Sequence, residues 1–282
     1  MNKTKIKWTD FTWNVVTGCT KVSEGCHHCY AKRIHDARHK AYLAGKKMPA
    51  QYAVPFETVL LQPDRLDYPL RLKTPHRIFV NSVSDLFHED IPFAFVDRVF
   101  AAMIEANWHT YQVLTKRPER MRDYFDDRKW GLPTNHVWPG VSVEDQATAD
   151  ERIPLLSQTP ASVRFVSYEP ALGPVDWLNA MCGCDKHGYR KPLLTDKKIG
   201  WIIVGGESGS KARPFDLAWA RGTVAQCKAA GVPVFIKQLG AHPVSFNTSP
   251  HDNKLYEVAI KHRAGADPSE WPEDLRVQEF PA

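Results

Sequence analysis

Short apolar segments rich in β-branched residues recur along the chain, and each is followed by a longer stretch with helical spacing. This alternation is typical of βαβ units and predicts an α/β fold. The candidate strands are Trp13–Thr17, Arg77–Asn81, Tyr111–Thr115, Val137–Val143, Val163–Ser167, Trp201–Val204 and Val234–Lys237. The candidate helices are Ala31–Ala44, Phe93–Asn107, Pro118–Asp126, Ala147–Leu156 and Leu217–Ala230.

Two helices carry clear local signals. Gly231 and Pro233 follow the last candidate helix and give it a stop signal. The helix that begins at Phe93 has the most regular apolar spacing, which predicts a single buried face. That face is expected to contain Phe93, Val96, Phe100, Met103 and Ile104.

Polar or glycine residues follow every candidate strand. A (βα) barrel collects such strand ends at one mouth, whereas a doubly wound sheet concentrates function at a single switch point. We therefore favour a partial or complete TIM-like barrel. The residues at the strand ends are Gly18 and Cys19; Asn81, Ser84 and Asp85; Thr115, Lys116 and Arg117; Ser142 and Glu144; Ser167 and Glu169; Gly205, Gly206 and Glu207; and Lys237 and Gln238.

The length of 282 residues and the 43% apolar content are sufficient for one large core, so we expect a single domain. Its core should span about residues 8–240, with residues 241–282 as a C-terminal extension. A polar insertion, Met181–Lys198, interrupts the strand–helix alternation. The insertion and the extension are interpreted as a lid and a covering tail.

The chain contains no apolar stretch of membrane-spanning length, and the N-terminal MNKTKIKWTD lacks the apolar core of a signal peptide. We therefore expect a cytoplasmic protein without a membrane partner. The formal net charge is +5 and the pI is near 8.8, values that permit a nucleic-acid partner without requiring one. The basic runs AKRIHDARHK and TKRPERMRDYFDDRK are equally consistent with solvated helix faces.

Three of the six cysteines, Cys19, Cys26 and Cys29, form a C-x6-C-x2-C motif on the loop after the first candidate strand. Without an export signal, metal binding is favoured over disulfides. Three thiolates can hold a 4Fe-4S cluster and leave one iron open. The alternative is zinc, completed by His27 or His28 or by Cys182 and Cys184. Cys227 lies within an amphipathic helix candidate and is expected to fill the core.

The segment NVVTGCTKVSEGCHHCYA resembles the N-x-x-x-G-C…G-C-x-x-C-Y-A opening of the spore photoproduct lyase-like branch of the radical S-adenosylmethionine (SAM) superfamily. That branch usually has three residues between its first two cysteines, where this chain has six. VLTKRPERMRDY is similar to the branch's T-K-S/R…R-D segment, and GVSVEDQATADERIP is similar to the S-x-x…D…R segment that follows it.

A resemblance over nearly the whole chain is to an uncharacterised bacteriophage and prophage family with the same three-cysteine motif. The matching stretches are WTDFTWNVVTGCTKVSEGCHHCYA, FVNSVSDLFHEDIP, VLTKRPERM, SYEPALGPVD, WIIVGGESG and FIKQLG.

These resemblances imply a radical SAM barrel with a 4Fe-4S cluster and SAM as cofactors. Such an enzyme cleaves SAM reductively to a 5′-deoxyadenosyl radical and needs a reductant protein of the flavodoxin or ferredoxin type. The resemblance to a phage family and the excess of basic over acidic residues suggest a nucleic-acid base or nucleotide as substrate, in DNA modification or lesion repair. The cell would be a bacterium or a phage-infected host. A zinc-stabilised, non-catalytic nucleic-acid-binding protein is the alternative.

The resemblance also implies roles around SAM. Tyr30 would lie beside its adenine or amino group, and Lys116 would reach its carboxylate. Asn81, Ser84 and Asp85 are suited to its ribose or amino group, although they also suit turns and helix caps. Ser142 has the same ambiguity. Gly205 and Gly206 would let the backbone approach a ligand while Glu207 binds an amine or hydroxyl, with a plain turn as the alternative.

Glu169 and Lys237 are the substrate-side candidates for catalysis. Both stand at strand ends, where an inward charge is costly unless it is paired. They are therefore expected either to pair with each other or to contact the substrate.

Overall fold

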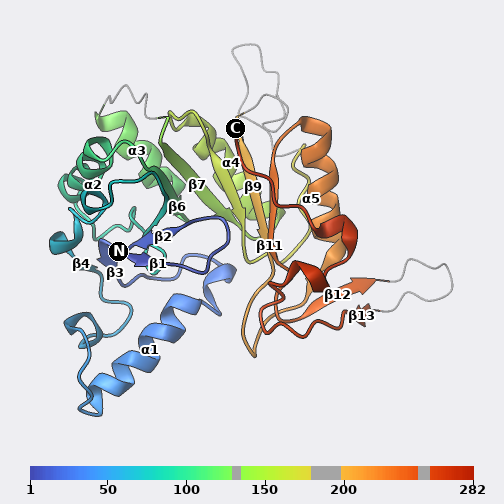
Figure 1. Ribbon diagram of the computed structural model, residues 1–282, viewed down its shortest axis with the longest axis horizontal. Helices are drawn as coiled ribbons and strands as arrows, with labels where there is room; N and C mark the ends of the chain where they lie inside the picture. The colour runs from blue at the N-terminus through green and yellow to red at the C-terminus, as the bar shows by residue number, and fades with distance from the viewer. Residues whose placement is uncertain (129–134, 179–197, 247–254) are drawn as a thin grey trace. The chain divides into compact units, whose positions relative to one another are not determined.

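The computed structural model describes residues 1–128, 135–178, 198–246 and 255–282 (Figure 1). Most of the insertion, with Cys182 and Cys184, lies outside these ranges. Eight strands form the main sheet in the order β1-β2-β5-β6-β7-β8-β9-β11. They are β1 (Asn2–Lys3), β2 (Phe11–Trp13), β5 (Arg77–Val80), β6 (Thr110–Thr115), β7 (Val137–Val143), β8 (Phe165–Tyr168), β9 (Trp201–Gly205) and β11 (Val234–Gln238).

The strand order follows the chain without reversal. The pairs β2–β5, β5–β6, β8–β9 and β9–β11 are all parallel, whereas the short β1 runs antiparallel to β2. A doubly wound sheet would reverse its order at a switch point. The sequential order is that of a partial (βα) barrel, so the α/β barrel-type prediction is confirmed.

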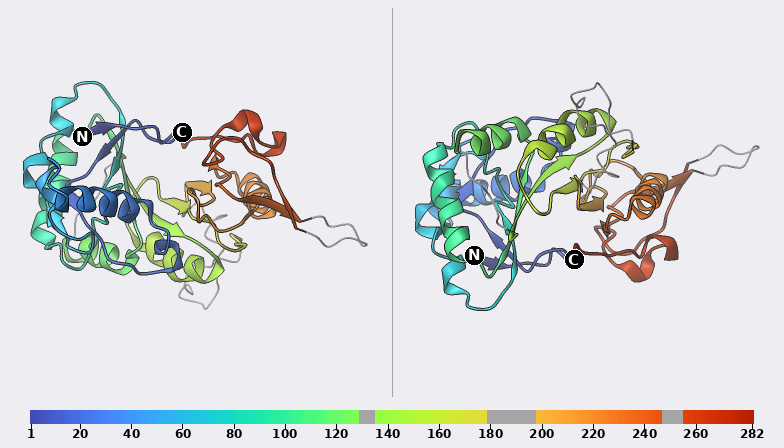
Figure 2. Two further views of the ribbon diagram at one scale, coloured as in Figure 1. Left: turned by 90° about the horizontal axis from the view of Figure 1, so that it is seen from below. Right: turned by 90° about the horizontal axis from the view of Figure 1, so that it is seen from above.

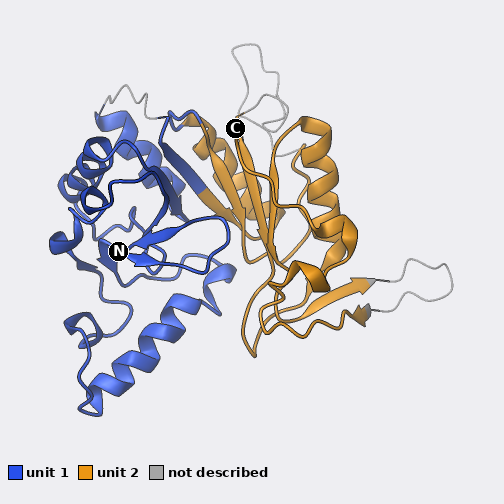
Figure 3. Ribbon diagram, viewed as in Figure 1, with its two compact units in different colours: residues 1–140, 159–162 blue, residues 141–158, 163–282 orange. Residues whose placement is uncertain are grey.

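The described chain forms two compact units (Figure 3). Unit 1 contains residues 1–140 and 159–162, and unit 2 contains residues 141–158 and 163–282. The division of residues 8–240 and 241–282 into one core and one extension stays a prediction.

The described residues of unit 1 form three helices: α1 (Tyr30–Leu43), α2 (Phe93–Glu105) and α3 (Pro118–Arg128). Helices α2 and α3 lie side by side (Figure 2) because the Tyr124 ring packs against Phe93 and Phe100. The prediction for α2 is wrong at Ile104, which is 37% exposed. The buried face is rotated towards Phe95 and Val99, so the helix turns Ile104 outwards.

Unit 1 also contains short elements. These are β3 (Val16–Thr17) and β4 (Leu60–Leu61), which pair antiparallel in a separate sheet, and the 3-10 turns η1 (Glu24–Cys26), η2 (Ala50–Tyr52), η3 (Pro63–Arg65) and η4 (Pro69–Arg71).

The prediction of one strand over Trp13–Thr17 is wrong in one respect, because the strand is interrupted between β2 and β3. The Asn81 side-chain oxygen accepts hydrogen bonds from the backbone N–H groups of Val15 and Val16, at 3.0 and 3.2 Å. These groups are therefore not available to the main sheet, and the chain turns away towards β4.

Unit 2 holds α4 (Gln146–Gln158) and α5 (Leu217–Ala230). Asp216 caps α5 by accepting a hydrogen bond from the Ala218 N–H at 2.9 Å. Gly231 ends the helix in the left-handed region, with φ of 66°, which confirms the predicted stop. Cys227 is fully buried, as predicted for a core residue.

The C-terminal segment of unit 2 has its own small elements and also reaches the main sheet. The Ile236 N–H donates to the Val277 carbonyl and the Glu279 N–H donates to the Val234 carbonyl, so this segment covers the edge of β11. No helix within the described ranges is long and apolar enough to cross a membrane. The small elements are β10 (Phe215–Asp216), β12 (Pro243–Phe246), β13 (Leu255–Glu257), η5 (Pro268–Glu270) and η6 (Glu273–Leu275).

Candidate functional site

A glycine places the first cysteine of unit 1. Gly18 has φ of +89°, and a Cβ there would lie 2.1 Å from the Thr58 carbonyl oxygen. Only glycine permits this close approach. The next residue, Cys19, then donates its backbone N–H to the Phe56 carbonyl at 3.0 Å, which fixes the start of the cysteine loop.

The other two cysteines flank the end of that loop. Cys26 ends η1, and Cys29 is the N-cap residue of α1. All three cysteines are free and partly exposed. Within the described ranges, no group of three or more His, Cys, Asp or Glu residues is arranged to hold a metal ion. His27, one zinc alternative, has its Nδ1 3.2 Å from a Glu24 carboxylate oxygen.

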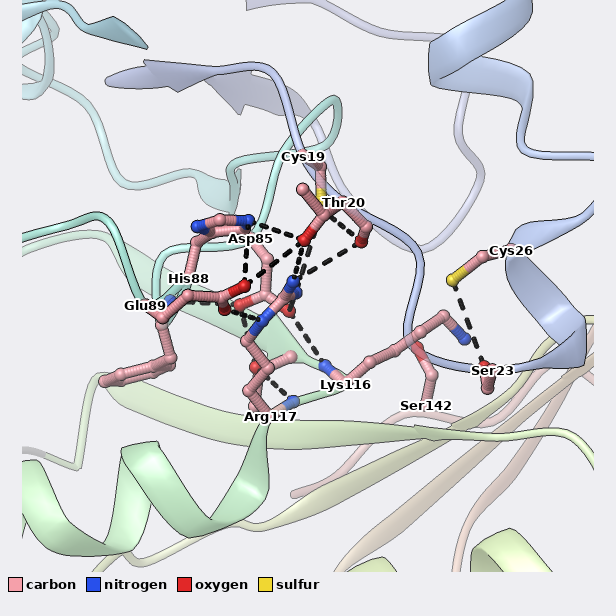
Figure 4. Close-up of polar contacts among 12 residues, drawn as sticks. Cys19, Thr20, Ser23, Cys26, Asp85, His88, Glu89, Lys116, Arg117 and Ser142 are labelled. Carbon is pink, nitrogen blue, oxygen red and sulfur yellow. Dashed lines mark hydrogen bonds and ion pairs between the residues drawn. The ribbon is translucent and has the colours of Figure 1, made fainter. Parts of the chain in front are cut away.

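Arg117 connects the first cysteine to the loop that follows β5 (Figure 4). Its Nη1 lies 3.7 Å from the Cys19 sulfur, and its Nη2 donates to the Thr20 hydroxyl at 2.8 Å. On the other side it pairs with Asp85 at 3.3 Å and Glu89 at 2.8 Å. The Arg117 side chain is only 9% exposed, so the guanidinium is a fixed positive charge beside a sulfur ligand candidate.

The Asp85 carboxylate organises the ends of β5 and β6. It accepts hydrogen bonds from the Thr115 hydroxyl at 2.7 Å and from the backbone N–H groups of Phe87 and Lys116, both at 3.0 Å. Because Arg117 also pairs with this carboxylate, both Asp85 oxygens have partners within the protein. The strand ends of unit 1 therefore converge around Asp85 and Arg117.

The Cys19 thiol has an unfavourable environment for ionisation. Burial, followed by the charge of Asp85, raises the pKa of Cys19 to about 12, while Arg117 acts in the opposite direction. Burial also lowers the pKa of His88. The His88 Nδ1 accepts from the Asp90 N–H at 3.2 Å, so the neutral ring carries its proton on Nε2 and donates it to Thr20 at 2.8 Å.

Asn81, Ser84 and Tyr30 hold this region together. Asn81 adopts φ of 58°, a conformation that asparagine tolerates better than most residues. The Ser84 hydroxyl donates to the Val16 carbonyl at 2.8 Å. The Tyr30 hydroxyl donates to the Ser82 carbonyl, while the residue remains 43% exposed. Each of these side chains thus contributes at least one contact to the cysteine-side structure.

The Lys116 side chain points away from that of Arg117 (Figure 4). Its backbone N–H is held by Asp85. Figure 4 shows its side chain extending away from Arg117 towards the part of the loop that carries Ser23 and Cys26. The adjacent residues Lys116 and Arg117 thus place two cations towards different parts of the cysteine loop.

Unit 2 brings the two catalytic candidates together. The Lys237 ammonium lies 2.9 Å from one Glu169 carboxylate oxygen and 3.0 Å from the other. Ser167 donates to the same carboxylate at 3.2 Å. The side chains are 25% and 14% exposed, so this is a partly buried ion pair. The prediction that these two residues either pair or contact a substrate holds in its first form.

Gly205 and Gly206 are required by the protein's own atoms. A Cβ at Gly205 would lie 2.2 Å from a Glu169 carboxylate oxygen, and one at Gly206 would lie 2.7 Å from the Leu239 carbonyl. Glu207 forms two short contacts with Arg213, at 2.6 and 3.2 Å to the guanidinium. The Gly-Gly-Glu segment therefore has an internal packing role.

Ser142 and Glu144 belong to a buried cluster of unit 2. Arg152 donates to the Ser142 carbonyl at 2.9 Å and pairs with Glu144 at 3.2 Å. The Arg152 and Glu144 side chains are 2% and 1% exposed. Because both side chains are buried, removing either partner would leave the other charge unpaired and would destabilise the fold.

A family model covers most of the chain. The model of DUF5131, described as a protein of unknown function, matches residues 3–266. The chain belongs to the DUF5131 family. No curated protein matches it. Among solved structures, a cysteine-to-serine mutant of spore photoproduct lyase is similar, with 9% identity, a TM-score of 0.43, and coverage of 98% of this chain and 74% of that chain.

Several residues that the structure makes central in this DUF5131 member carry no functional signal in the sequence. By sequence, Arg117 is only a strand-end residue beside Lys116. His88, Arg152 and Arg213 had no assigned role. Each acts through partners distant in sequence or through burial, so spacing alone carries no signal for them. The basic doublet of Lys116 and Arg117 directly after a strand was the one usable indication.

The donor set fits an iron–sulfur cluster in its chemistry. Three cysteines on one eleven-residue segment are free of disulfides and partly exposed, and a cation lies beside the first. Metal binding commonly completes the folding of its ligand loop. Binding of the cluster would then bring the three cysteine sulfurs together.

Proposed function

We propose that this DUF5131 member is a radical SAM enzyme in which Cys19, Cys26 and Cys29 hold a 4Fe-4S cluster. The single observation that carries the proposal is the set of three free thiols on the loop after the first strands of a partial (βα) barrel. When bound, the cluster and SAM would supply a 5′-deoxyadenosyl radical. A reductant protein of the flavodoxin or ferredoxin type would be its electron source.

The residues around the cysteines have defined tasks in this proposal. Arg117 supplies positive charge at Cys19, which favours the thiolate needed for metal ligation. Asp85 and Glu89 hold that guanidinium in place. Asn81 and Ser84 fix the backbone from which the loop begins. These five residues position the ligand loop.

Lys116 is the proposed ligand of the SAM carboxylate, because a fixed ammonium suits that anion. Tyr30 presents a partly exposed ring directly after the third cysteine, which suits contact with the adenine or the amino group of SAM. The remaining SAM-binding proposals concern unit 2 and comprise Ser142, Gly205, Gly206 and Glu207. Among these, the backbone of the two glycines is better suited to contact SAM than Glu207, because the Glu207 carboxylate is already paired with Arg213.

Glu169 and Lys237 are proposed as the substrate-side residues. Their ion pair is partly exposed, so a polar substrate group can compete for either partner. The carboxylate can accept a proton and the ammonium can donate one, which makes the pair suited to moving a proton at a substrate nitrogen or oxygen. A nucleic-acid base or nucleotide offers such atoms.

The decisive experiment is anaerobic purification followed by reconstitution with iron and sulfide. We expect a brown protein with about four irons per chain, a change in its electron paramagnetic resonance spectrum on adding SAM, and formation of 5′-deoxyadenosine with dithionite. A colourless protein with stoichiometric zinc and no 5′-deoxyadenosine would instead establish the zinc-stabilised alternative.

A matched pair of variants makes the test specific. Cys29→Ala removes one proposed ligand and should abolish both the colour and 5′-deoxyadenosine formation. Cys227→Ala removes the buried cysteine of α5 and should retain the cluster. Equal iron content in the two variants would contradict the assignment of Cys29.

A further inference from the structure

The basic character of the chain is concentrated in one segment of unit 1. Residues 30–47, comprising α1 and the turn after it, contain six lysines and arginines and one acid, Asp36. Removing these from the 37 basic and 32 acidic residues of the whole chain leaves 31 of each. The formal charge of +5 is therefore that of this segment, and the rest of the chain is balanced.

The charges of this segment are mostly unpaired. Within the described part of the chain, five of its six basic side chains have no acidic partner: Arg33, Arg38, Lys40, Lys46 and Lys47. Only Lys32 is paired, with Asp36 and Glu57. Elsewhere, cations are commonly paired, as in Arg71–Asp67, Arg128–Asp97, Arg152–Glu144, Arg213–Glu207 and Arg221–Asp274.

One narrow face attaches α1 to unit 1. His35 Nε2 contacts the Val54 carbonyl at 2.9 Å, and His39 Nδ1 contacts the Tyr52 carbonyl at 2.8 Å. Arg33 and Lys40 lie on the opposite face, seven residues or about two turns apart. Figure 1 shows α1 apart from α2 and α3. The basic face is therefore open along the length of the helix, about 21 Å at 1.5 Å per residue.

The pattern of apolar residues decides between possible partners. Ile34 and Leu43 are 39% and 69% exposed, but nine residues at 100° each place them on opposite sides of the helix. A membrane-surface helix needs one continuous apolar face. A protein interface is depleted of lysine at its core. A polyphosphate backbone needs only a row of unpaired cations.

We propose that residues 30–47 form a binding surface for single-stranded nucleic acid. Arg33, Lys40, Lys46 and Lys47 contact phosphates, and the 39% exposed Tyr42 ring, close in sequence to these lysines, stacks on a base. The surface begins one residue after Cys29. An enzyme that acts on a base needs that base out of the duplex stack, which favours a single strand.

This inference rests on the proposed function, because the nucleic acid held here is the substrate proposed for the cysteine site. Its test is independent of the cluster. The full-length chain is titrated against a fluorescently labelled single-stranded DNA, and against the duplex of the same sequence, over a series of salt concentrations. We expect tighter binding of the single strand, with an affinity that falls steeply with salt.

Removing lysines should change the salt dependence of DNA binding only when the lysines belong to this surface. In the triple variant Lys40→Ala, Lys46→Ala and Lys47→Ala, the slope of log affinity against log salt should fall by about 2, at about 0.7 per lost phosphate contact. The matched control removes three lysines elsewhere, Lys211, Lys228 and Lys261, which have no acidic partner among the described residues, and should keep the wild-type slope. Tyr42→Ala should weaken binding about tenfold, the lower part of the range for one stacked base, and Tyr42→Phe should not.

Three outcomes would overturn the proposal. Equal losses in the two triple variants would make the binding a non-specific charge effect. Tighter binding of the duplex would contradict the single-strand assignment, and binding of anionic vesicles without DNA binding would establish a membrane surface. Iron content separates the two proposals, because the Lys40, Lys46 and Lys47 variant should assemble the same cluster as the wild type. DNA binding without any cluster would refute the proposed enzyme and leave this surface standing.

Discussion

Gly205 illustrates at the scale of one residue how packing dictates identity. A Cβ at this position would lie 2.2 Å from the Glu169 carboxylate, which Lys237 and Ser167 hold in place. We expect Gly205→Ala to lower the free energy of unfolding by about 1 kcal/mol, the low end for overpacking. Urea denaturation measures this change.

Gly222 is the matched control. It lies within α5, and a Cβ there would meet nothing within 4 Å. Gly222→Ala should raise the free energy of unfolding by about 0.5–1 kcal/mol, because alanine loses less backbone entropy in a helix. The same sign of change in both variants would show that the Glu169 contact does not restrict position 205.

Arg117 leads to a second prediction at this scale. Arg117→Met would remove the cation that faces Asp85, whose side chain is 7% exposed. Because the Thr115 hydroxyl and two backbone N–H groups still bind Asp85, we expect a loss of about 2 kcal/mol in unfolding free energy, below the usual cost of breaking a buried pair.

The control for Arg117 is Arg122→Met. Arg122 pairs with its neighbour Asp123 at the surface of α3, and the expected change is within about 0.5 kcal/mol. Both variants are compared by urea denaturation of protein without metal. A similar small change in both would mean that Arg117 does not organise the Asp85 region.

At the scale of the element, Asn81 decides where β2 stops. Its φ of 58° costs most other residues about 1–2 kcal/mol, and its side chain accepts from Val15 and Val16. Asn81→Gly should lose only those hydrogen bonds, because glycine tolerates the positive φ. Asn81→Ala should lose the hydrogen bonds and also pay the conformational cost of the positive φ. We therefore expect unfolding free energies in the order wild type, Asn81→Gly, Asn81→Ala. Equal values for the two variants would exclude a conformational role.

The regular elements were predictable because they depend on local periodicity. Helix α5 matches its predicted range, Leu217–Ala230, and strand β7 matches Val137–Val143. The errors occur where a distant residue intervenes. Asn81 splits the first strand from 65 residues away, and the packing of α2 leaves Ile104 outside. Neither effect has a signature in the local pattern.

At the scale of unit 1, one buried and one half-buried histidine predict a pH dependence of stability. Burial lowers the pKa of His109 and of His136 in the folded state. As pH falls through about 6.5, the unfolded chain binds protons before the folded chain does, and stability is lost. We expect full stability above this pH and a progressive decrease below it, measured by urea denaturation across pH 5–8.

His136→Gln tests the origin of that decrease. The glutamine amide can still donate to the Met103 carbonyl that His136 Nε2 contacts at 3.1 Å, but it does not titrate. The variant should lose less stability than the wild type between pH 7 and 5. An unchanged pH profile would assign the effect to other groups.

The sequence by itself determined the strand–helix alternation, the barrel-type order and the three cysteines, because local periodicity and spacing encode these features. Tertiary structure alone decided that Arg117 faces Cys19, that Glu169 pairs with Lys237, and that Gly205 accommodates their carboxylate. These contacts join residues 98, 68 and 36 positions apart. Only the folded backbone brings such pairs within the few ångströms over which hydrogen bonds and ion pairs act.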